Sequence, residues 1–90
     1  MRDLSVMKYT VIVPKPVQKQ LENLIQTERT KIILVLKQIA EDPRPSGIKK
    51  LKGYEKTYRV RVGDYRIIYE IKDRELIVLV LSVSHRKDAY

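Results

Sequence analysis

The spacing of apolar residues changes along the chain, and the first part shows a short strand followed by helical spacing. Residues 8–13 are rich in β-branched side chains, which is typical of a strand. Pro14 and Pro16 end that strand, because proline cannot donate to a sheet ladder. Pro16 can also occupy the first position of a helix, so we expect a helix to begin there. The apolar face of this helix consists of Val17, Leu21 and Leu24.

A second helix is predicted from about Glu28 to Glu41, after a polar break at residues 26–27. Its apolar stripe consists of Ile32, Val35, Leu36 and Ile39. The segment 42–45 reads Asp-Pro-Arg-Pro and ends the helix, because a residue that precedes proline avoids the helical region. The two helices are expected to form a helical hairpin, and residues 46–53 follow it as a basic loop.

The second half of the chain alternates apolar and polar residues with a period of two, which predicts strands. Residues 57–62 and 65–72 form a hairpin around Gly63–Asp64, because glycine at the first loop position suits a type II′ turn. A weaker turn at residues 73–74 leads into a last strand over residues 75–84, which is apolar on both faces. Such a strand is expected to be central in the sheet and covered on both sides.

This order of elements predicts an α+β fold, an antiparallel-rich sheet of four strands with the helical hairpin on one face. The chain has 90 residues, so we expect residues 1–90 to form a single domain with residues 1–6 as a flexible extension. The longest apolar run, residues 76–81, is far shorter than the roughly 20 residues of a membrane span. Because the chain also begins without an apolar signal core, we expect a cytoplasmic protein.

The composition excludes several kinds of site and indicates a kind of partner. There is no cysteine, so disulfides, thiolate metal sites and cysteine nucleophiles are excluded. The single histidine, His85, has no carboxylates around it at the spacing of a zinc site. The chain has 19 basic and 11 acidic residues and a formal charge of +8, which favours an acidic partner, either nucleic acid or an acidic protein.

The two-residue loop of the hairpin sets its register, so that Arg61 lies opposite Arg66. One face of the hairpin is then apolar and docks the helices; it consists of Tyr58, Val60, Val62, Tyr65, Ile67, Tyr69 and Ile71. The other face carries Arg59, Arg61 and Arg66 together. Like charges directly opposite each other destabilise a sheet, whereas guanidinium groups match the oxygens of a phosphate. The cluster therefore predicts a phosphate site, and the alternative is a solvated basic face on which Glu70 pairs with one arginine.

The last strand is expected to add an apolar strip to the arginine face. If its turn also has two residues, the strip consists of Ile77, Leu79, Leu81 and Val83. An exposed apolar strip of this kind indicates a binding site, unless the stems of lysine and arginine side chains cover it.

Three segments together resemble the RelE/ParE superfamily of bacterial toxin–antitoxin toxins. They are residues 50–53 (KLKG), residues 58–70 (YRVRVGDYRIIYE) and residues 83–90 (VSHRKDAY). The resemblance extends over nearly the whole chain from Met7 and implies a RelE-like fold.

RelE-type members bind the ribosomal A site and cut messenger RNA there, using the 2′-hydroxyl as nucleophile without a metal. The resemblance therefore implies an endoribonuclease, an mRNA interferase without a cofactor, that inhibits translation. Its catalytic site would correspond, motif by motif, to Arg59, Arg61, Arg66, Arg86 and Tyr90. Flanking RNA would be held by Arg59, Lys49, Lys50, Lys52 and Lys87.

The family often has lysines where this chain has Arg59 and Arg61, and this change affects the choice of general base. Arginine stays protonated at any working pH, so neither residue can accept the proton of the 2′-hydroxyl. Tyr90 is favoured by the resemblance, because neighbouring arginines would lower its pKa from the ordinary value of about 10. His85 is the alternative, because its ordinary pKa already lies near neutral pH.

The resemblance also implies partners. A cognate antitoxin would wrap the toxin, cover the apolar strip and supply acidic groups to the arginines. Its contacts are expected at Ile68, Ile77, Leu79 and Leu81. The other expected partners are the ribosome and messenger RNA, with DNA reached only indirectly through the antitoxin complex and no membrane contact.

Two other functions stay open. A ParE-like relative would be a non-enzymatic inhibitor of DNA gyrase, against which the arginine cluster and the tail 85–90 argue. A non-catalytic basic module would bind nucleic acid in general, but the chain has no recognition-helix motif and most of its tyrosines lie on the predicted core face.

Overall fold

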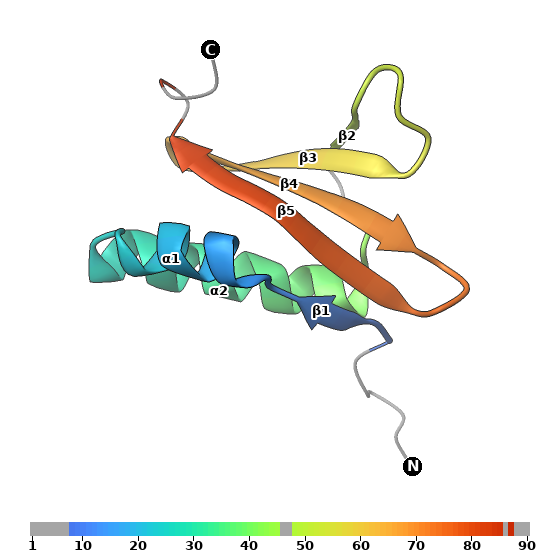
Figure 1. Ribbon diagram of the computed structural model, residues 1–90, viewed down its shortest axis with the longest axis horizontal. Coiled ribbons are helices and arrows are strands. Elements are labelled where there is room, and N and C mark those ends of the chain that lie inside the picture. Colours follow the sequence, from blue (N-terminus) through green and yellow to red (C-terminus); the bar gives the residue numbers. More distant parts are fainter. Residues whose placement is uncertain (1–7, 46–47, 86, 88–90) are drawn as a thin grey trace.

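The computed structural model describes residues 8–45, 48–85 and 87, and it has the predicted α+β architecture (Figure 1). Two helices pack against one face of a five-stranded sheet, whose strand order is β1-β5-β4-β3-β2. The elements are β1 (Thr10–Ile12), α1 (Lys15–Glu22), α2 (Gln26–Glu41), β2 (Lys49–Lys50), β3 (Thr57–Val62), β4 (Tyr65–Lys72) and β5 (Ile77–His85). The predicted extension at residues 1–6 lies outside the described residues.

Two expectations about the sheet were wrong. The sheet has five strands instead of four, because Lys49 and Lys50 of the expected basic loop pair with β3 as the short strand β2. β5 is an interior strand as predicted, between β1 and β4. However, the described helices cover only one of its faces, and Leu81 is 44% exposed.

The helices form where the apolar spacing placed them, with small shifts at their ends. α1 has Pro16 in its first turn and buries Val17 and Leu21 against the sheet. α2 begins at Gln26, two residues before the predicted start, and ends at Glu41 before Pro43. The apolar residues of α2 and of the helix-facing side of the sheet form one core; its fully buried members are Ile32, Ile39, Ile67, Tyr69, Ile71, Val78 and Val80.

The edge of β5 is covered by two different elements. β1 pairs in parallel with its first three residues, from Thr10 opposite Ile77 to Ile12 opposite Leu79. Farther along β5, α1 covers the edge of the strand. There the backbone N–H of Val83 donates a hydrogen bond of 2.8 Å to Oε1 of Gln20. A helix side chain thus satisfies a strand N–H that has no sheet partner among the described residues.

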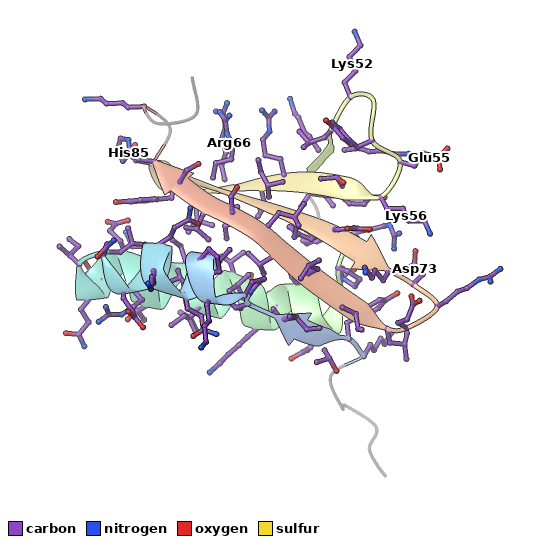
Figure 2. All side chains as sticks on the ribbon, viewed as in Figure 1. Lys52, Glu55, Lys56, Arg66, Asp73 and His85 are labelled. Carbon is purple, nitrogen blue, oxygen red and sulfur yellow. The ribbon has the colours of Figure 1, made fainter. Side chains whose placement is uncertain are left out.

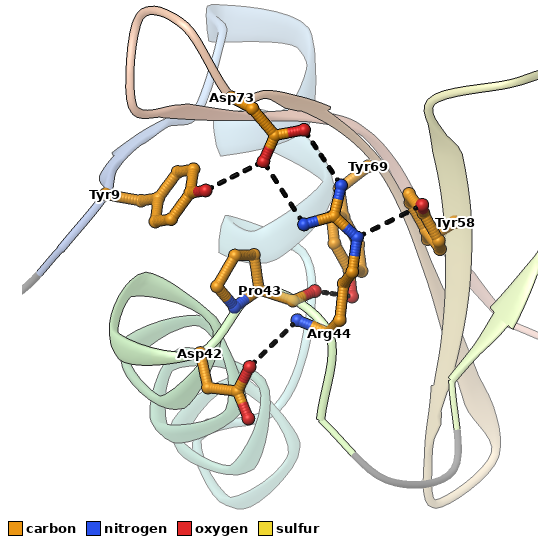
Figure 3. A network of polar contacts seen from close by, with 7 residues as sticks. All are labelled: Tyr9, Asp42, Pro43, Arg44, Tyr58, Tyr69 and Asp73. Carbon is orange, nitrogen blue, oxygen red and sulfur yellow. Dashed lines mark hydrogen bonds and ion pairs between the residues drawn. The ribbon is translucent and has the colours of Figure 1, made fainter.

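A polar network fastens the segment after α2 to the sheet (Figure 3). The guanidinium of Arg44 donates to both carboxylate oxygens of Asp73, at 3.2 and 2.9 Å, and its Nε donates to the hydroxyl of Tyr58 at 3.2 Å. The hydroxyl of Tyr9 donates to the same carboxylate at 2.8 Å. The buried hydroxyl of Tyr69 donates to the carbonyl of Pro43 at 2.8 Å. The network joins the residue before β1 and the segment after α2 to β3, β4 and the β4–β5 turn.

We expect Asp73→Asn to destabilise the protein at neutral pH and to change its acid dependence. The hydrogen bonds from Arg44, and then from Tyr9, hold the pKa of Asp73 below its ordinary value. The folded state is therefore stabilised by the charged carboxylate at neutral pH, and this contribution is lost as pH falls below about 4. Urea midpoints of the wild type and the variant should differ at pH 7 and converge at pH 3. Glu75→Gln, in the same exposed turn, is the control, and an unchanged difference at both pH values would contradict the prediction.

Candidate nucleic-acid interface

The β3–β4 hairpin has the predicted register. Its two-residue loop places Val62 opposite Tyr65, Arg61 opposite Arg66 and Arg59 opposite Ile68. Gly63 has a φ of 60°. Among the described residues other than glycine, only Leu76 has a positive φ, so the φ of Asp64 is negative. A positive φ at the first loop position alone is the requirement of the predicted type II′ turn.

The register brings cationic side chains together in rows across the sheet. On the face that no described helix covers, called the open face below, Arg61 lies beside Arg66, and Arg66 lies beside Ser84 of β5. Two residues along the strands, a second row contains Lys49, Arg59, Ile68 and Ser82. Figure 2 shows that Arg66 extends from the sheet on the side away from the helices.

The three arginines differ in burial. Arg61 is exposed, Arg59 is half-buried, and Arg66 is only 8% exposed, with its Nε atom buried. Within the described part of the chain, neither Arg59 nor Arg61 forms an ion pair with an acidic side chain. Glu70 therefore pairs with neither of these two arginines. Like charges directly opposite each other on adjacent strands, such as Lys49 and Arg59, raise the free energy of the folded state, and a bound polyanion would lower it.

The apolar strip lies on the open face, but one predicted member was wrong. The β4–β5 loop has four residues, from Asp73 to Leu76, so Ile77 pairs with Lys72. With this loop, Ile77 and Leu79 still lie on the open face, as predicted. A β-bulge opposite Ile68 and Tyr69 then leaves Leu81 as an extra residue and shifts the alternation. Val83 consequently faces the helices and is 4% exposed, because the bulge turns it into the core.

The parallel pairing of β1 adds a residue that the sequence pattern did not indicate. Ile12 lies opposite Leu79, so it extends the apolar strip toward the edge of the sheet, and it is 40% exposed. Ile68, in the second cationic row, joins the strip to the arginines. The open face is thus basic toward the β3–β4 turn and apolar toward β1. Ile12 can be assigned to the strip only when the strand that pairs with β1 is known. The sequence of a three-residue strand does not indicate its partner.

The remaining predicted residues are more dispersed. Lys50 lies opposite Tyr58 and therefore belongs to the helix-facing side, whereas Lys52 extends from the β2–β3 loop on the side away from the helices (Figure 2). His85 lies opposite Tyr65, and the two rings form an edge contact with centroids 5.2 Å apart. The backbone N–H of Lys87, an exposed residue, donates to Nδ1 of His85 at 3.1 Å. Arg86 and Tyr90 lie outside the described residues.

Two further findings concern sites of other kinds. The residues that the structure describes contain no group of three or more histidine, aspartate or glutamate side chains arranged to hold a metal ion. Neither described helix has the length and the run of apolar residues needed to cross a membrane.

Comparisons with known proteins relate this arrangement to one group of proteins. A family model described as the ParE toxin of the type II toxin–antitoxin system parDE matches residues 11–90. RelE1 of Methanocaldococcus jannaschii is 32% identical over 87 residues, which cover 93% of this chain and 97% of that protein. The mRNA interferase toxin RelE of Escherichia coli is 30% identical over 71 residues, which cover 77% of this chain and 74% of that protein.

A solved structure agrees with the sequence comparisons. The archaeal RelE–RelB complex from Pyrococcus horikoshii contains a chain that matches this one with a TM-score of 0.82 at 28% identity. The match covers 92% of this chain and 100% of that one. Sequence and fold therefore indicate the same relatives.

Proposed function

Because the chain belongs to the RelE/ParE superfamily of toxins of type II toxin–antitoxin systems, we propose that it is an endoribonuclease that cuts messenger RNA on the ribosome. The pairing of Arg61 with Arg66 on an open sheet face is the observation that carries the proposal. The name of the Escherichia coli relative, an mRNA interferase, supports the same reaction.

In the proposed reaction, the 2′-oxygen of a nucleotide attacks the adjacent phosphorus and loses its proton to a general base. The bond from phosphorus to the 5′-oxygen breaks, and this oxygen takes up a proton from a general acid. The products are a 2′,3′-cyclic phosphate and a 5′-hydroxyl. Arg61 and Arg66 would bind the non-bridging oxygens, on which negative charge increases in the transition state. Arg86, by family resemblance, would stabilise the same charge or assist the leaving oxygen.

The position of His85 favours Tyr90 as the general base. His85 lies beside Tyr65, on the strand positions that face the helices, whereas Arg61 and Arg66 lie on the open face. Its Nδ1 already accepts a hydrogen bond from Lys87. Tyr90 is assigned by resemblance alone, and clustered arginines would favour its phenolate form.

We expect Tyr90→Phe to lower the cleavage rate by about 10²- to 10⁴-fold, the usual contribution of a general base. His85→Gln should lower it only a few-fold and leave the pH dependence unchanged. Cleavage of a defined message on programmed ribosomes, measured from pH 6 to 9, tests both variants. The reverse result, in which His85→Gln removes the pH dependence and Tyr90→Phe does not, would make His85 the base.

We also propose that a cognate antitoxin covers the apolar strip of the open face. Complexes of RelE with RelB are known from the relatives. The strip adjoins the arginines, so one acidic and apolar segment could contact both.

Leu81→Asp should weaken antitoxin binding about tenfold or more, because it places a charge at an exposed apolar contact. Cleavage should persist, since Leu81 is the extra residue of the bulge and belongs to neither arginine row. Affinity for the antitoxin, measured by calorimetry, checks the prediction, and Leu34→Asp on the exposed side of α2 is the matched control. Equal affinities of the two variants would exclude the strip as a contact.

Mapping of messenger RNA 5′ ends after brief expression tests the proposed activity. New ends bearing a 5′-hydroxyl should appear within translated regions in cells and in a reconstituted reaction with ribosomes. Cutting of free message at an equal rate would remove the ribosome from the proposal, and the absence of new ends would refute the nuclease.

The matching family model is that of a ParE toxin, which keeps gyrase inhibition as a second candidate. This function predicts that DNA replication stops before translation and that plasmid supercoiling changes. The nuclease predicts the opposite order.

A further inference from the structure

An exposed tyrosine stands on the loop between β2 and β3. Tyr54 is 63% exposed, and its side chain has no hydrogen-bond or ring partner among the described residues. The other described tyrosines are engaged: Tyr9 binds Asp73, and Tyr58, Tyr65 and Tyr69 lie on the helix-facing side of the sheet. Figure 1 shows that this loop rises from the sheet on the side away from the helices.

The backbone gives the loop a defined shape. The N–H of Tyr54 donates to the carbonyl of Leu51 at 3.1 Å, and Gly53 has a φ of 86°. This combination is that of a type II turn with Lys52 and Gly53 at its centre. A further bond of 2.8 Å joins the N–H of Leu51 to the carbonyl of Thr57 and closes the base of the loop. The turn fixes the backbone that carries Lys52 and Tyr54, so binding there costs little backbone conformational entropy.

The loop continues the line of the two cationic rows. The first row contains Arg61, the second contains Arg59 and Lys49, and the loop follows at the next step along β3, beside Thr57. Positions two residues apart on a strand are separated by about 7 Å. The backbone of an extended, unstacked single strand advances by a comparable distance with each nucleotide. The spacing of successive rows therefore matches the advance of successive nucleotides in such a strand.

We propose that Tyr54 stacks on a base of single-stranded RNA two nucleotides from the phosphate held by Arg61 and Arg66, while Lys52 contacts the adjoining phosphate. The inference rests on the proposed nuclease function and adds a subsite to it. An exposed aromatic ring between cationic groups is the usual platform for an unpaired base, because every base offers a π-face and the backbone supplies negative charge. Loss of the ring should weaken binding about ten- to a hundredfold.

A tryptophan probe tests this subsite directly. The chain contains no tryptophan, so Tyr54→Trp introduces one tryptophan, which can be excited apart from the tyrosines and can still stack on a base. Its fluorescence, taken as the difference from the tryptophan-free wild type on the same ribosomes, should be quenched when the variant binds ribosomes programmed with a message. Leu34→Trp is the matched control, because Leu34 is 53% exposed on α2, on the other side of the molecule, and its signal should stay constant.

Ribosomes without message identify the source of the base. Quenching that needs the message assigns the base to messenger RNA, and quenching by vacant ribosomes assigns it to ribosomal RNA; either result supports the subsite. Wild-type cleavage is measured on the same programmed ribosomes. If the wild type cuts and Tyr54→Trp is not quenched, the subsite is refuted while the nuclease stands. If the wild type does not cut, the proposed function itself fails.

Kinetics provide a second measurement. Tyr54→Leu should raise KM for programmed ribosomes about ten- to a hundredfold with little change in kcat, and Tyr54→Phe should retain the wild-type KM. Lys52→Gln should raise KM and reduce its salt dependence, whereas Lys37→Gln on α2 should do neither. An unchanged KM in Tyr54→Leu would overturn the proposal.

Discussion

Cleavage of messenger RNA is expected to fall by about a thousandfold or more when Arg61 and Arg66 are both replaced by alanine. The two residues lie directly opposite each other on adjacent strands, on the same face of the sheet, which is the placement that a shared phosphate requires. Removal of a single donor to a developing oxyanion typically costs 10²–10³ in rate, and the second loss adds to the first. Single-turnover cleavage on programmed ribosomes measures the effect, and relief of growth arrest on expression should accompany it.

Controls separate chemistry from folding in this experiment. Arg74→Ala removes an exposed guanidinium from the β4–β5 turn and should leave cleavage unchanged. Arg61→Lys with Arg66→Lys keeps the charge but loses the planar fork, so an intermediate rate is expected. Circular dichroism checks that the double alanine variant folds, since Arg66 is buried. Full activity in a folded double variant would refute the proposed role of the pair.

Tyr69→Ala is expected to destabilise the protein by about 3–5 kcal/mol, the usual cost of removing a buried aromatic side chain. The ring is fully buried, lies 6.1 Å from the ring of Tyr58, and binds Pro43 through its hydroxyl. Domains of this size have a total stability of about 5–15 kcal/mol, so the variant should be largely or partly unfolded. Urea denaturation followed by circular dichroism gives the change in free energy.

Tyr69→Phe distinguishes the hydroxyl from the ring. It should cost only about 1 kcal/mol, because the ring remains and one hydrogen bond is lost. Burial, and then the neighbouring Tyr58, raise the pKa of Tyr69 to about 12. In the unfolded chain the group ionises near pH 10, so wild-type stability should fall further than that of Tyr69→Phe between pH 10 and 12. A loss in Tyr69→Phe as large as in Tyr69→Ala would contradict this division.

The sequence pattern was sufficient where local geometry decides the structure. The two-residue loop at Gly63–Asp64 leaves only one register, so the opposition of Arg61 and Arg66 was predicted correctly. The resemblance to the RelE/ParE superfamily is likewise confirmed by the family match and the related structures. The helix-facing residues of the hairpin followed from the same alternation.

The errors arose where pairing depends on distant parts of the chain. β2 has two residues, both lysine, and no pattern marks them as a strand. The bulge at Leu81 reverses the alternation within an unbroken apolar run, so Val83 could not be assigned to the core from its spacing. Arg44 appeared to be part of a simple helix stop, and its bonds to Asp73 and Tyr58 depend on the assembled sheet.

The contact between Gln20 and Val83 has a consequence for how copies of the protein meet. β1 covers only three residues of β5, and a longer bare strand edge would offer its amides and carbonyls to a strand of another molecule. α1 lies beside β5 where such a strand would pair, and the side-chain amide of Gln20 already accepts the hydrogen bond of one backbone N–H, that of Val83. The helix therefore protects this rim of the sheet against intermolecular strand addition, the first step toward aggregates of a chain rich in valine and isoleucine.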